Sequence, residues 1–331
     1  MRCGLITIII GQVINIHNVN KYSWALILHY VCRFWCSWFT LSNIDLCSVL
    51  SGGSVNALRV VHVIPSEGRA RYAVTSRGDE VFVSSYNSHQ IEVYSTSTFT
   101  LQRSLTIPGL GACCYGLVAC IRNNCLYASD HSNSSIHRVD LSDTNAVKSW
   151  LVGSEPTGLS VNKAHNVVVT CGVNKLQEYT TRGSLVREIS IQCTDLTKPW
   201  HAVQLSTGDY MVSHGASPGV VTIVGVDGQV VCSFDQSVLS TVGQMKYPKS
   251  LAVTKNDDIL VVDAGNNRIL SVNSSLSSVQ VLSLPVDDGV QGPWGLYLDE
   301  SQGRLYVSEW GGRVWVLEIV ALSHWAELNA V

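Results

Sequence analysis

The sequence predicts an all-β fold, a six-bladed β-propeller closed by an N-terminal strand, and three observations support this prediction. A pattern of about 45 residues occurs six times between residues 71 and 317. Within each copy, β-branched residues alternate with polar ones in short runs, and Gly- or Asn-containing turns separate the runs. Helical periodicity is missing from this region, which excludes solenoids of helix pairs. Six repeats of this length indicate the blades of a propeller.

The two clearest copies are residues 248–272, PKSLAVTKNDDILVVDAGNNRILSV, and residues 293–317, PWGLYLDESQGRLYVSEWGGRVWVL. Each copy begins with Pro and continues with a short apolar strand, a polar turn, a second strand, a Gly-containing loop and a third strand. The same frame fits four other stretches, the first of them more loosely. They begin at Arg71, Cys114, Pro156 and Pro199.

Each blade needs a fourth strand, and repeats one to five supply it before the next repeat begins, as in VQVLSLP at residues 279–285. The sixth repeat reaches Val320 without such a stretch. Residues 60–65, VVHVIP, end in the same apolar-Pro pair that closes the earlier fourth strands. We therefore expect residues 58–64 to pair with the strand near Arg313–Ile319 and to close the ring without an open sheet edge.

The expected domain organisation is a hydrophobic leader at residues 1–57, the propeller at residues 58–320 and a C-terminal tail at residues 321–331. The leader contains an apolar run at residues 23–41 that is long enough to span a bilayer. Arg33 lies near the middle of that run, where a charged residue costs roughly 2.5–3.5 kcal/mol on insertion. A membrane anchor, a signal and a non-native segment all stay open as interpretations.

The eleven cysteines show no zinc-ligand spacing and fit reduced core residues. A protein with reduced cysteines is typical of the cytoplasm. We therefore expect a cytoplasmic location, with a membrane-anchored or secreted protein as the alternative.

The run P-x-x-L-x-V followed by D-I-L-V-V-D-A-G-N-N-R-I in the fifth repeat resembles the NHL repeat, a family that forms six-bladed propellers. The resemblance covers roughly residues 58–320 and is strong only in repeat five. Similar proteins include the tripartite-motif ubiquitin ligases, in which the propeller follows a RING, a B-box and a coiled coil. None of those modules is visible in this sequence. The resemblance implies a non-catalytic propeller that recruits substrates for ubiquitin-dependent turnover.

The stretch VVDAGNNRIL at residues 261–270 predicts a structural turn formed by Asp263, Asn266 and Asn267. Asn tolerates the left-handed conformation that a turn between two strands requires. A short carboxylate before the turn can accept backbone N–H groups, and Arg268 is placed to lie against it. The positions taken as equivalent to Asp263 carry one further carboxylate, which favours local turn chemistry over a shared ion site. Those positions are Ser85, Asp130, Thr170, His214 and Ser308.

The loops after the second strands and the connections between blades emerge on one face of a propeller. Aromatic residues and Arg on exposed loops dominate the energy of many protein interfaces. We therefore expect a protein partner on this loop face, although several of the Trp residues could instead pack between blades. The expected binding residues are Tyr86, His89, Tyr115, His131, Trp200, His201, His214, Arg268, Trp294 and Trp310.

Catalysis at a metal is the first alternative. Lactonase-type six-bladed hydrolases hold a calcium ion with Glu and Asn side chains, whereas the strand positions of this sequence offer mostly Ser, Thr, Gly and apolar residues. An amidating-enzyme lyase built on this repeat type needs several His around a metal. His131, His201 and His214 occupy different repeat positions. We therefore expect no metal site, no catalytic residues and no cofactor.

Binding of single-stranded RNA is the second alternative. Residues 58–331 hold 19 Lys and Arg and 24 Asp and Glu, a balance of −5. Stacking aromatic residues are present, but the charge that would neutralise phosphates is not. We therefore expect weak binding to nucleic acid.

Overall fold

A computed structural model describes residues 56–321 except for 144–145, 173, 194–197, 216–217, 234–241 and 283–288. Residues Ala57–Val320 form one compact unit. The predictions for the leader, including residues 23–41, and for the tail fall almost wholly outside the described residues. Within the described part of the chain, no helix has the length and hydropathy needed to cross a bilayer.

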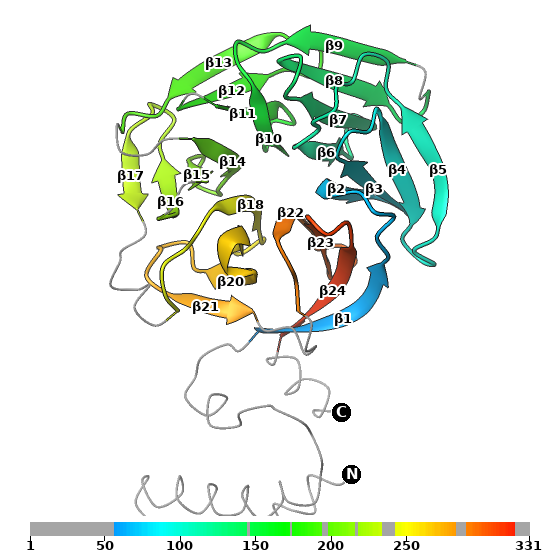
Figure 1. Ribbon diagram of the computed structural model, residues 1–331. Coiled ribbons are helices and arrows are strands. Elements are labelled where there is room, and N and C mark those ends of the chain that lie inside the picture. The colour runs from blue at the N-terminus through cyan, green and yellow to red at the C-terminus, as the bar shows by residue number, and fades with distance from the viewer. Residues whose placement is uncertain are drawn as a thin grey trace, which may run out of the picture. The chain divides into compact units, whose positions relative to one another are not determined.

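Six four-stranded sheets stand in a ring, so the predicted all-β, six-bladed propeller is confirmed (Figure 1). In each sheet the first strand lies nearest the centre of the ring and the fourth lies at the rim (Figure 1). The innermost strands are β2 (Arg71–Arg77), β6 (Leu117–Cys120), β10 (Pro156–Val161), β14 (Pro199–Gln204), β18 (Pro248–Val253) and β22 (Pro293–Asp299). They begin blades one to six in that order.

The remaining strands complete the blades in sequence order. The second strands are β3 (Glu80–Ser85), β7 (Cys125–Asp130), β11 (Val167–Cys171), β15 (Tyr210–His214), β19 (Ile259–Asp263) and β23 (Arg304–Glu309). The third strands are β4 (Gln90–Ser95), β8 (Ser135–Asp140), β12 (Lys175–Tyr179), β16 (Val220–Val224), β20 (Arg268–Val272) and β24 (Val314–Ala321). The outer strands are β5 (Leu101–Thr106), β9 (Val147–Leu151), β13 (Leu185–Ser190), β17 (Val230–Ser233), β21 (Val279–Leu282) and β1 (Asn56–Ile64).

The hydrophobic core is divided into layers between adjacent blades. Phe82 and Ile91 of blade one pack in the same cluster as Leu117 and Leu126 of blade two. The second strands are buried along almost their whole length, whereas an outer strand such as β9 is mostly exposed. Both faces of a second strand therefore contact neighbouring blades, which explains its continuous apolar sequence.

The N-terminal strand closes the ring as predicted. β1 is the hydrogen-bonded neighbour of β24, and the sixth sheet has the order β1-β24-β23-β22. Leu58 and Ile64 are 2% and 1% exposed and pack into the clusters on the two sides of blade six. Pairing of this apolar run predicts that Val60, Val61, Val63 and Ile64 are buried, which is wrong for Val61, because its side chain is 40% exposed. Alternation along the strand turns Val61 towards solvent.

The strand register corrects two of the repeat equivalences. Pro248 pairs with Asp263 across the β18–β19 ladder. In blade three the corresponding partner of Pro156 is Cys171 and not Thr170. In blade six the partner of Pro293 is Glu309 and not Ser308, because the hairpin from Pro293 to its partner is one residue longer than the hairpin from Pro248 to Asp263. A buried carboxylate thus ends the second strand in blades two, five and six.

Candidate binding face

A ring of six side chains lies at the beginning of the innermost strands. Each blade contributes the residue that follows its first Pro, or the residue at the same position of the repeat. Contacts among five of these side chains, together with the hydrogen bond from the Thr157 hydroxyl to the Pro199 carbonyl, show that the strand beginnings converge at one end of the central cavity, which we name the aromatic mouth. The six residues are Tyr72, Tyr115, Thr157, Trp200, Lys249 and Trp294.

Three rings from alternate blades cover the cavity at this mouth. The ring centroid of Tyr115 in blade two lies 5.5 Å from that of Trp200 in blade four. The Trp200 and Trp294 centroids are 5.4 Å apart, and those of Tyr115 and Trp294 are 6.1 Å apart. These distances are typical of aromatic rings in direct contact. The three rings therefore meet over the axis of the propeller.

Further rings extend this cluster outward. The Tyr72 ring lies 4.8 Å from Tyr115 and contacts both Tyr86 and Trp310 at 5.8 Å. Tyr86 is 49% exposed and Trp310 is 55% exposed. The aromatic mouth therefore has a packed centre and an exposed rim. The His131 ring meets that of Tyr115 edge to face, with the centroids 5.0 Å apart.

Lys249 is the one ring residue that carries a charge. Its Nζ lies 3.3 Å from the Trp200 ring centroid and 4.4 Å from that of Trp294, within the range of a cation–π interaction. The side chain is only 9% exposed. Burial, with a smaller contribution from the charge of Lys198, lowers the pKa of Lys249 to about 8.

The phenols beside Lys249 supply no counter-charge. Burial raises the pKa of Tyr72 to about 12 and also raises that of Tyr115. Both groups are therefore neutral at physiological pH. The positive charge of Lys249 is compensated within the ring only by the faces of the two indole rings.

Hydrogen bonds between blades fix the backbone of the ring. The Ser213 hydroxyl donates to the carbonyl of Lys249 over 2.6 Å, and the Ser308 hydroxyl donates to that of Tyr72 over 3.1 Å. In both cases a residue near the end of a second strand reaches the innermost strand of the next blade. Gly295 permits one of these approaches, since a Cβ there would lie 2.4 Å from the Tyr72 carbonyl oxygen.

His201 and His214 lie inside the propeller instead of on the loop face. His201 is 8% exposed, its Nε2 lies 2.9 Å from the Leu159 carbonyl, and its Nδ1 accepts the backbone N–H of Leu251 at 3.0 Å. It thus links the innermost strands of blades three, four and five. Burial lowers the pKa of His201, which favours the neutral imidazole. His214 is 1% exposed and its Nε2 lies 3.1 Å from the Thr222 hydroxyl.

The turn after Asp263 is held by hydrogen bonds to the Asp263 carboxylate, as predicted for a structural turn. The Asp263 carboxylate is fully buried and accepts hydrogen bonds from the Lys246 backbone N–H at 2.7 Å and from Arg268 Nε at 2.6 Å. Asn266 Nδ2 donates to it at 2.8 Å, and Asn267 has a left-handed φ of 52°. Arg268 is half-buried against the linker that precedes β18, so its guanidinium is engaged within the fold.

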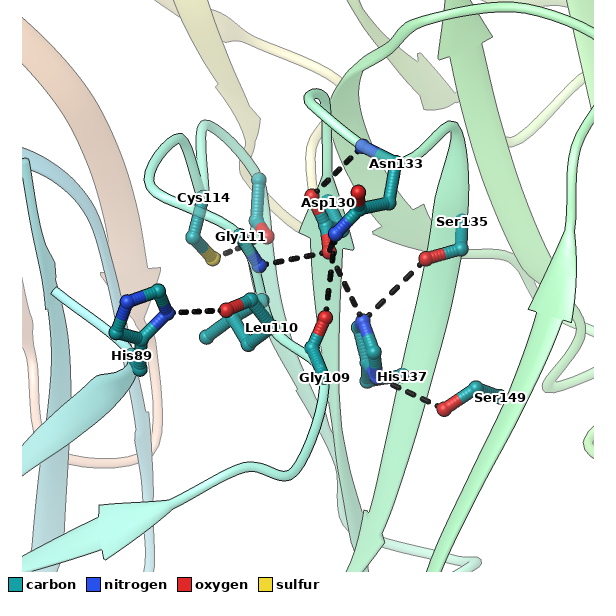
Figure 2. Close-up of polar contacts among 11 residues, drawn as sticks. His89, Gly109, Leu110, Gly111, Cys114, Asp130, Asn133, Ser135, His137 and Ser149 are labelled. Carbon is teal, nitrogen blue, oxygen red and sulfur yellow. Dashed lines mark hydrogen bonds and ion pairs between the residues drawn. The ribbon is translucent and has the colours of Figure 1, made fainter. Parts of the chain in front are cut away.

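Asp130 repeats this arrangement in blade two (Figure 2). Its carboxylate accepts the Gly111 N–H at 2.7 Å and the Asn133 side chain at 2.8 Å, and His137 takes the place of the arginine at 3.3 Å. Burial alone would raise the pKa of this carboxyl. Hydrogen bonds from Asn133, Gly111 and His137 outweigh burial and hold the pKa of Asp130 below its usual value. His89, in the turn between β3 and β4, contacts the carbonyl of Leu110, which lies in the same linker as Gly111 (Figure 2).

Glu309 completes the set in blade six. Its carboxylate accepts the Gln291 N–H at 2.6 Å, Arg313 Nε at 2.7 Å and Trp315 Nε1 at 2.6 Å. All three carboxylates bind the linker that leads into their own blade. They therefore anchor the linkers beside the aromatic mouth and leave no open position for a shared ion.

The central cavity has a volume of about 470 Å³ and is lined by all six innermost strands. Apolar side chains such as Leu117, Val161 and Val253 line part of its wall. Over the described ranges, no group of three or more His, Cys, Asp or Glu side chains could hold a metal ion. The end opposite the aromatic mouth is formed by exposed or half-buried turn residues, and we name it the polar mouth. It comprises Lys163, Gln204, Ser206, Lys255, Asp257 and Glu300.

Sequence reasoning identified Tyr115, Trp200 and Trp294 but missed Tyr72 and Lys249. All five occupy the same position of the repeat. That shared position was the signal that could have found the missing two. Tyr72 was missed because repeat one begins with Arg71 in place of Pro. Lys249 was missed because a lysine differs in chemistry from the aromatic residues at the same position of the other repeats.

Comparisons with known proteins agree with this architecture. The NHL repeat family matches residues 245–270, which include β18 and β19. Together with the six-bladed ring, this match supports an NHL-repeat propeller. No curated protein sequence matches the chain.

Three solved structures illustrate the similarity of fold. A streptogramin B lyase superposes with a TM-score of 0.59 at 11% identity, covering 80% of this chain and 98% of that chain. An inactive virginiamycin B lyase from Staphylococcus aureus with quinupristin gives 0.57 at 12% identity, covering 80% and 100%. The WD40 propeller of Doa1 gives 0.56 at 12% identity, covering 79% and 97%. At these identities the similarity shows the fold alone.

Proposed function

We propose that this protein is a non-catalytic interaction propeller that binds a protein partner at its aromatic mouth. The observation that carries the proposal is the continuous aromatic cluster with Tyr86 and Trp310 exposed at its rim. Large aromatic side chains that are already packed lose little conformational entropy on binding, and they are the residues that most often dominate interface energy. The resemblance to NHL-type ubiquitin ligases makes substrate recruitment the finer form of this proposal.

Site-specific photo-crosslinking tests the proposal. A photoreactive amino acid at position 310 places the probe on the aromatic mouth, and the same probe at Lys255 places it on the polar mouth. We expect a specific partner to crosslink from position 310 and not from position 255. Purified partner should then bind the unlabelled protein, and Trp310→Ala should weaken that binding by about tenfold or more, the usual effect of truncating an interface hot spot. Equal crosslinking from both positions would contradict the proposal.

The hydrolase or lyase alternative has less support. The solved lyases are similar in fold, but the described lining of the cavity contains apolar side chains where a metal-dependent enzyme would need convergent carboxylates or histidines. Elemental analysis of the purified full chain decides between the two functions. Stoichiometric zinc or calcium would favour the enzyme.

A further inference from the structure

The aromatic mouth contains a buried cation that has no anionic partner among the described residues. The Lys249 ammonium makes no hydrogen bond or ion pair there, and its contacts are the faces of Trp200 and Trp294. A buried charge normally has an ion-pair partner or several hydrogen bonds, because desolvation is costly. Cation–π attraction of about 2 kcal/mol offsets only part of that cost. The three donor positions of this ammonium are therefore available for an acceptor.

A second donor beside Lys249 is also unsatisfied. The Trp294 Nε1 atom is buried and has no hydrogen-bond partner among the residues that the structure describes. Trp294 is one of the two rings that contact Lys249. Buried donors without acceptors are uncommon in native proteins. The Lys249 ammonium and the Trp294 N–H occupy neighbouring ring positions, and neither has an acceptor among the described residues. The missing group is therefore an acceptor, and the positive charge of Lys249 favours an anion.

Two further lysines lie beside Lys249. Lys198 directly precedes β14, and Lys246 lies two residues before β18, so both flank Lys249 on the aromatic mouth. Both are exposed and form no ion pair within the described part of the chain. The Asp263 carboxylate, which binds the linker before β18, is engaged by Arg268 and by the Lys246 backbone N–H. We name Lys198, Lys246 and Lys249 the lysine sector.

The fold leaves an approach to Lys249. Gly215 follows β15, and a Cβ at this position would lie 3.7 Å from the Lys249 Nζ and 3.6 Å from the Trp200 ring. Among the described residues, the absence of a side chain at Gly215 leaves space beside the ammonium on this side. An anionic side chain could reach Nζ there while the chain that carries it packs on the exposed rim at Trp310 and Tyr86.

We propose that the partner binds through an acidic segment, with one Asp or Glu carboxylate seated on Lys249 and neighbouring carboxylates facing Lys198 and Lys246. This inference deepens the proposed function and rests on it. The structure favours an acidic protein segment over RNA because the sector has only three lysines, whereas residues 58–331 carry a net charge of −5. A nucleic acid requires a basic surface that follows its backbone.

Fluorescence anisotropy with defined probes tests this inference. The probes are a labelled, C-terminally amidated Glu/Phe peptide, its Gln/Phe counterpart and an oligouridine of the same net charge. We expect the Glu/Phe peptide to bind at least about tenfold more tightly than the Gln/Phe peptide, and the difference to shrink as salt rises. Equal affinity for the two peptides would overturn the inference. Tighter binding of the oligouridine would overturn it in favour of nucleic acid.

Variants assign the effect to the lysine sector. Lys249→Met keeps the length of the side chain and removes the charge, and we expect it to weaken binding of the Glu/Phe peptide by about tenfold or more. Lys255→Met at the polar mouth is the matched control and should leave the affinity unchanged. Undiminished binding by Lys249→Met would overturn the inference. If Lys249→Met does not fold, the Glu-to-Gln comparison and its salt dependence on the wild-type protein decide alone.

The failure of this inference can be distinguished from failure of the proposed function. Crosslinking from position 310 can succeed and Trp310→Ala can weaken binding of the partner while Lys249→Met leaves that binding unchanged. In that case the aromatic mouth is an interaction face, and the inference of an acidic segment is wrong. If position 310 yields no specific partner, the proposed function itself fails.

Discussion

The aromatic mouth and the polar mouth are opposite ends of the same channel and are built by the same six repeats, but they bury their charges differently. At the aromatic mouth Asp263 is fully buried and is bound by Arg268 and by a backbone N–H. At the polar mouth, Asp257 of blade five accepts the Ser206 N–H of blade four at 3.0 Å from an exposed turn. A carboxylate thus binds a backbone N–H at both ends, within its own blade and linker at the aromatic mouth and across two blades at the polar mouth. Because water screens the exposed Asp257 contact more than the buried Asp263 contacts, we expect charged groups at the aromatic mouth to contribute more to stability.

The largest expected effect comes from removing the strand that holds both mouths in one closed ring. Deleting residues 1–57 should leave a soluble, cooperatively folded propeller. Deleting residues 1–66 also removes most of β1, including the buried Leu58 and Ile64. Each such buried aliphatic side chain contributes roughly 1.5–3 kcal/mol, a large part of the ~5–15 kcal/mol stability of a domain. We expect a markedly lower melting temperature and aggregation through the uncovered β24 edge. Equal melting temperatures for the two truncations would refute closure by β1.

The second expected effect compares one substitution at the two mouths. Asp263→Asn leaves Arg268 buried against a neutral amide, and breaking a buried charge pair typically costs about 3–5 kcal/mol. Arg268 is 16% exposed, so we expect the lower end of that range. Asp257→Asn removes an exposed, screened acceptor and should cost about 1 kcal/mol or less. Urea unfolding of both variants measures the two values. Similar losses would show that burial does not separate the mouths.

The propeller fold was largely predictable from the sequence because the residue pattern that determines it repeats in every blade. Strand alternation and the repeated Pro fixed the number of blades, and the apolar run before Pro65 located the closing strand. The turn at Asp263 was also predicted, since Asn266, Asn267 and Arg268 have turn and ion-pair chemistry that is local in sequence. Local and periodic features can be read from a single sequence.

The aromatic mouth was less predictable because its contacts join blades that are far apart in sequence. His201 was expected on an exposed loop, but its two ring nitrogens bond Leu159 and Leu251, each about 40 or 50 residues away. Nothing in the sequence around His201 indicates those partners. Lys249 is similar, since its burial depends on Trp200 and Trp294 from other blades. Glu309 was missed for a local reason, because the hairpin from Pro293 to Glu309 is one residue longer than the one from Pro248 to Asp263.

The third expected effect is a rise in the free energy of unfolding at alkaline pH, caused by the lowered pKa of Lys249. Its pKa is about 8 in the folded protein and about 10.4 in an unfolded chain. Between these values the unfolded state binds more protons, so the free energy of unfolding rises with pH, by up to about 1.4 kcal/mol per pH unit. Below pH 8 both states are charged and the group gives no slope. Thermal unfolding of the wild type and of Lys249→Met between pH 8 and about 9.5 measures the difference. The exposed Lys255 provides the control, and a Lys255→Met variant should keep the wild-type slope.

The smallest expected effect on stability separates the rim of the aromatic mouth from its centre. Trp310 is 55% exposed, and Ile121, in the turn between β6 and β7 on the polar side, is 73% exposed. Truncating either residue to Ala removes little buried area, so each should change the free energy of unfolding by about 1 kcal/mol or less. The Trp310 ring also contacts Trp294 at 5.5 Å, which places the stability loss of Trp310→Ala at the upper end of that range.

Partner binding should nevertheless distinguish the two variants, because only Trp310 lies on the aromatic mouth. A Trp310→Ala protein that unfolds like wild type and still captures the partner at full affinity would show that the exposed rim has no part in recognition. A large loss of stability would instead show that the rim belongs to the packed core of the ring.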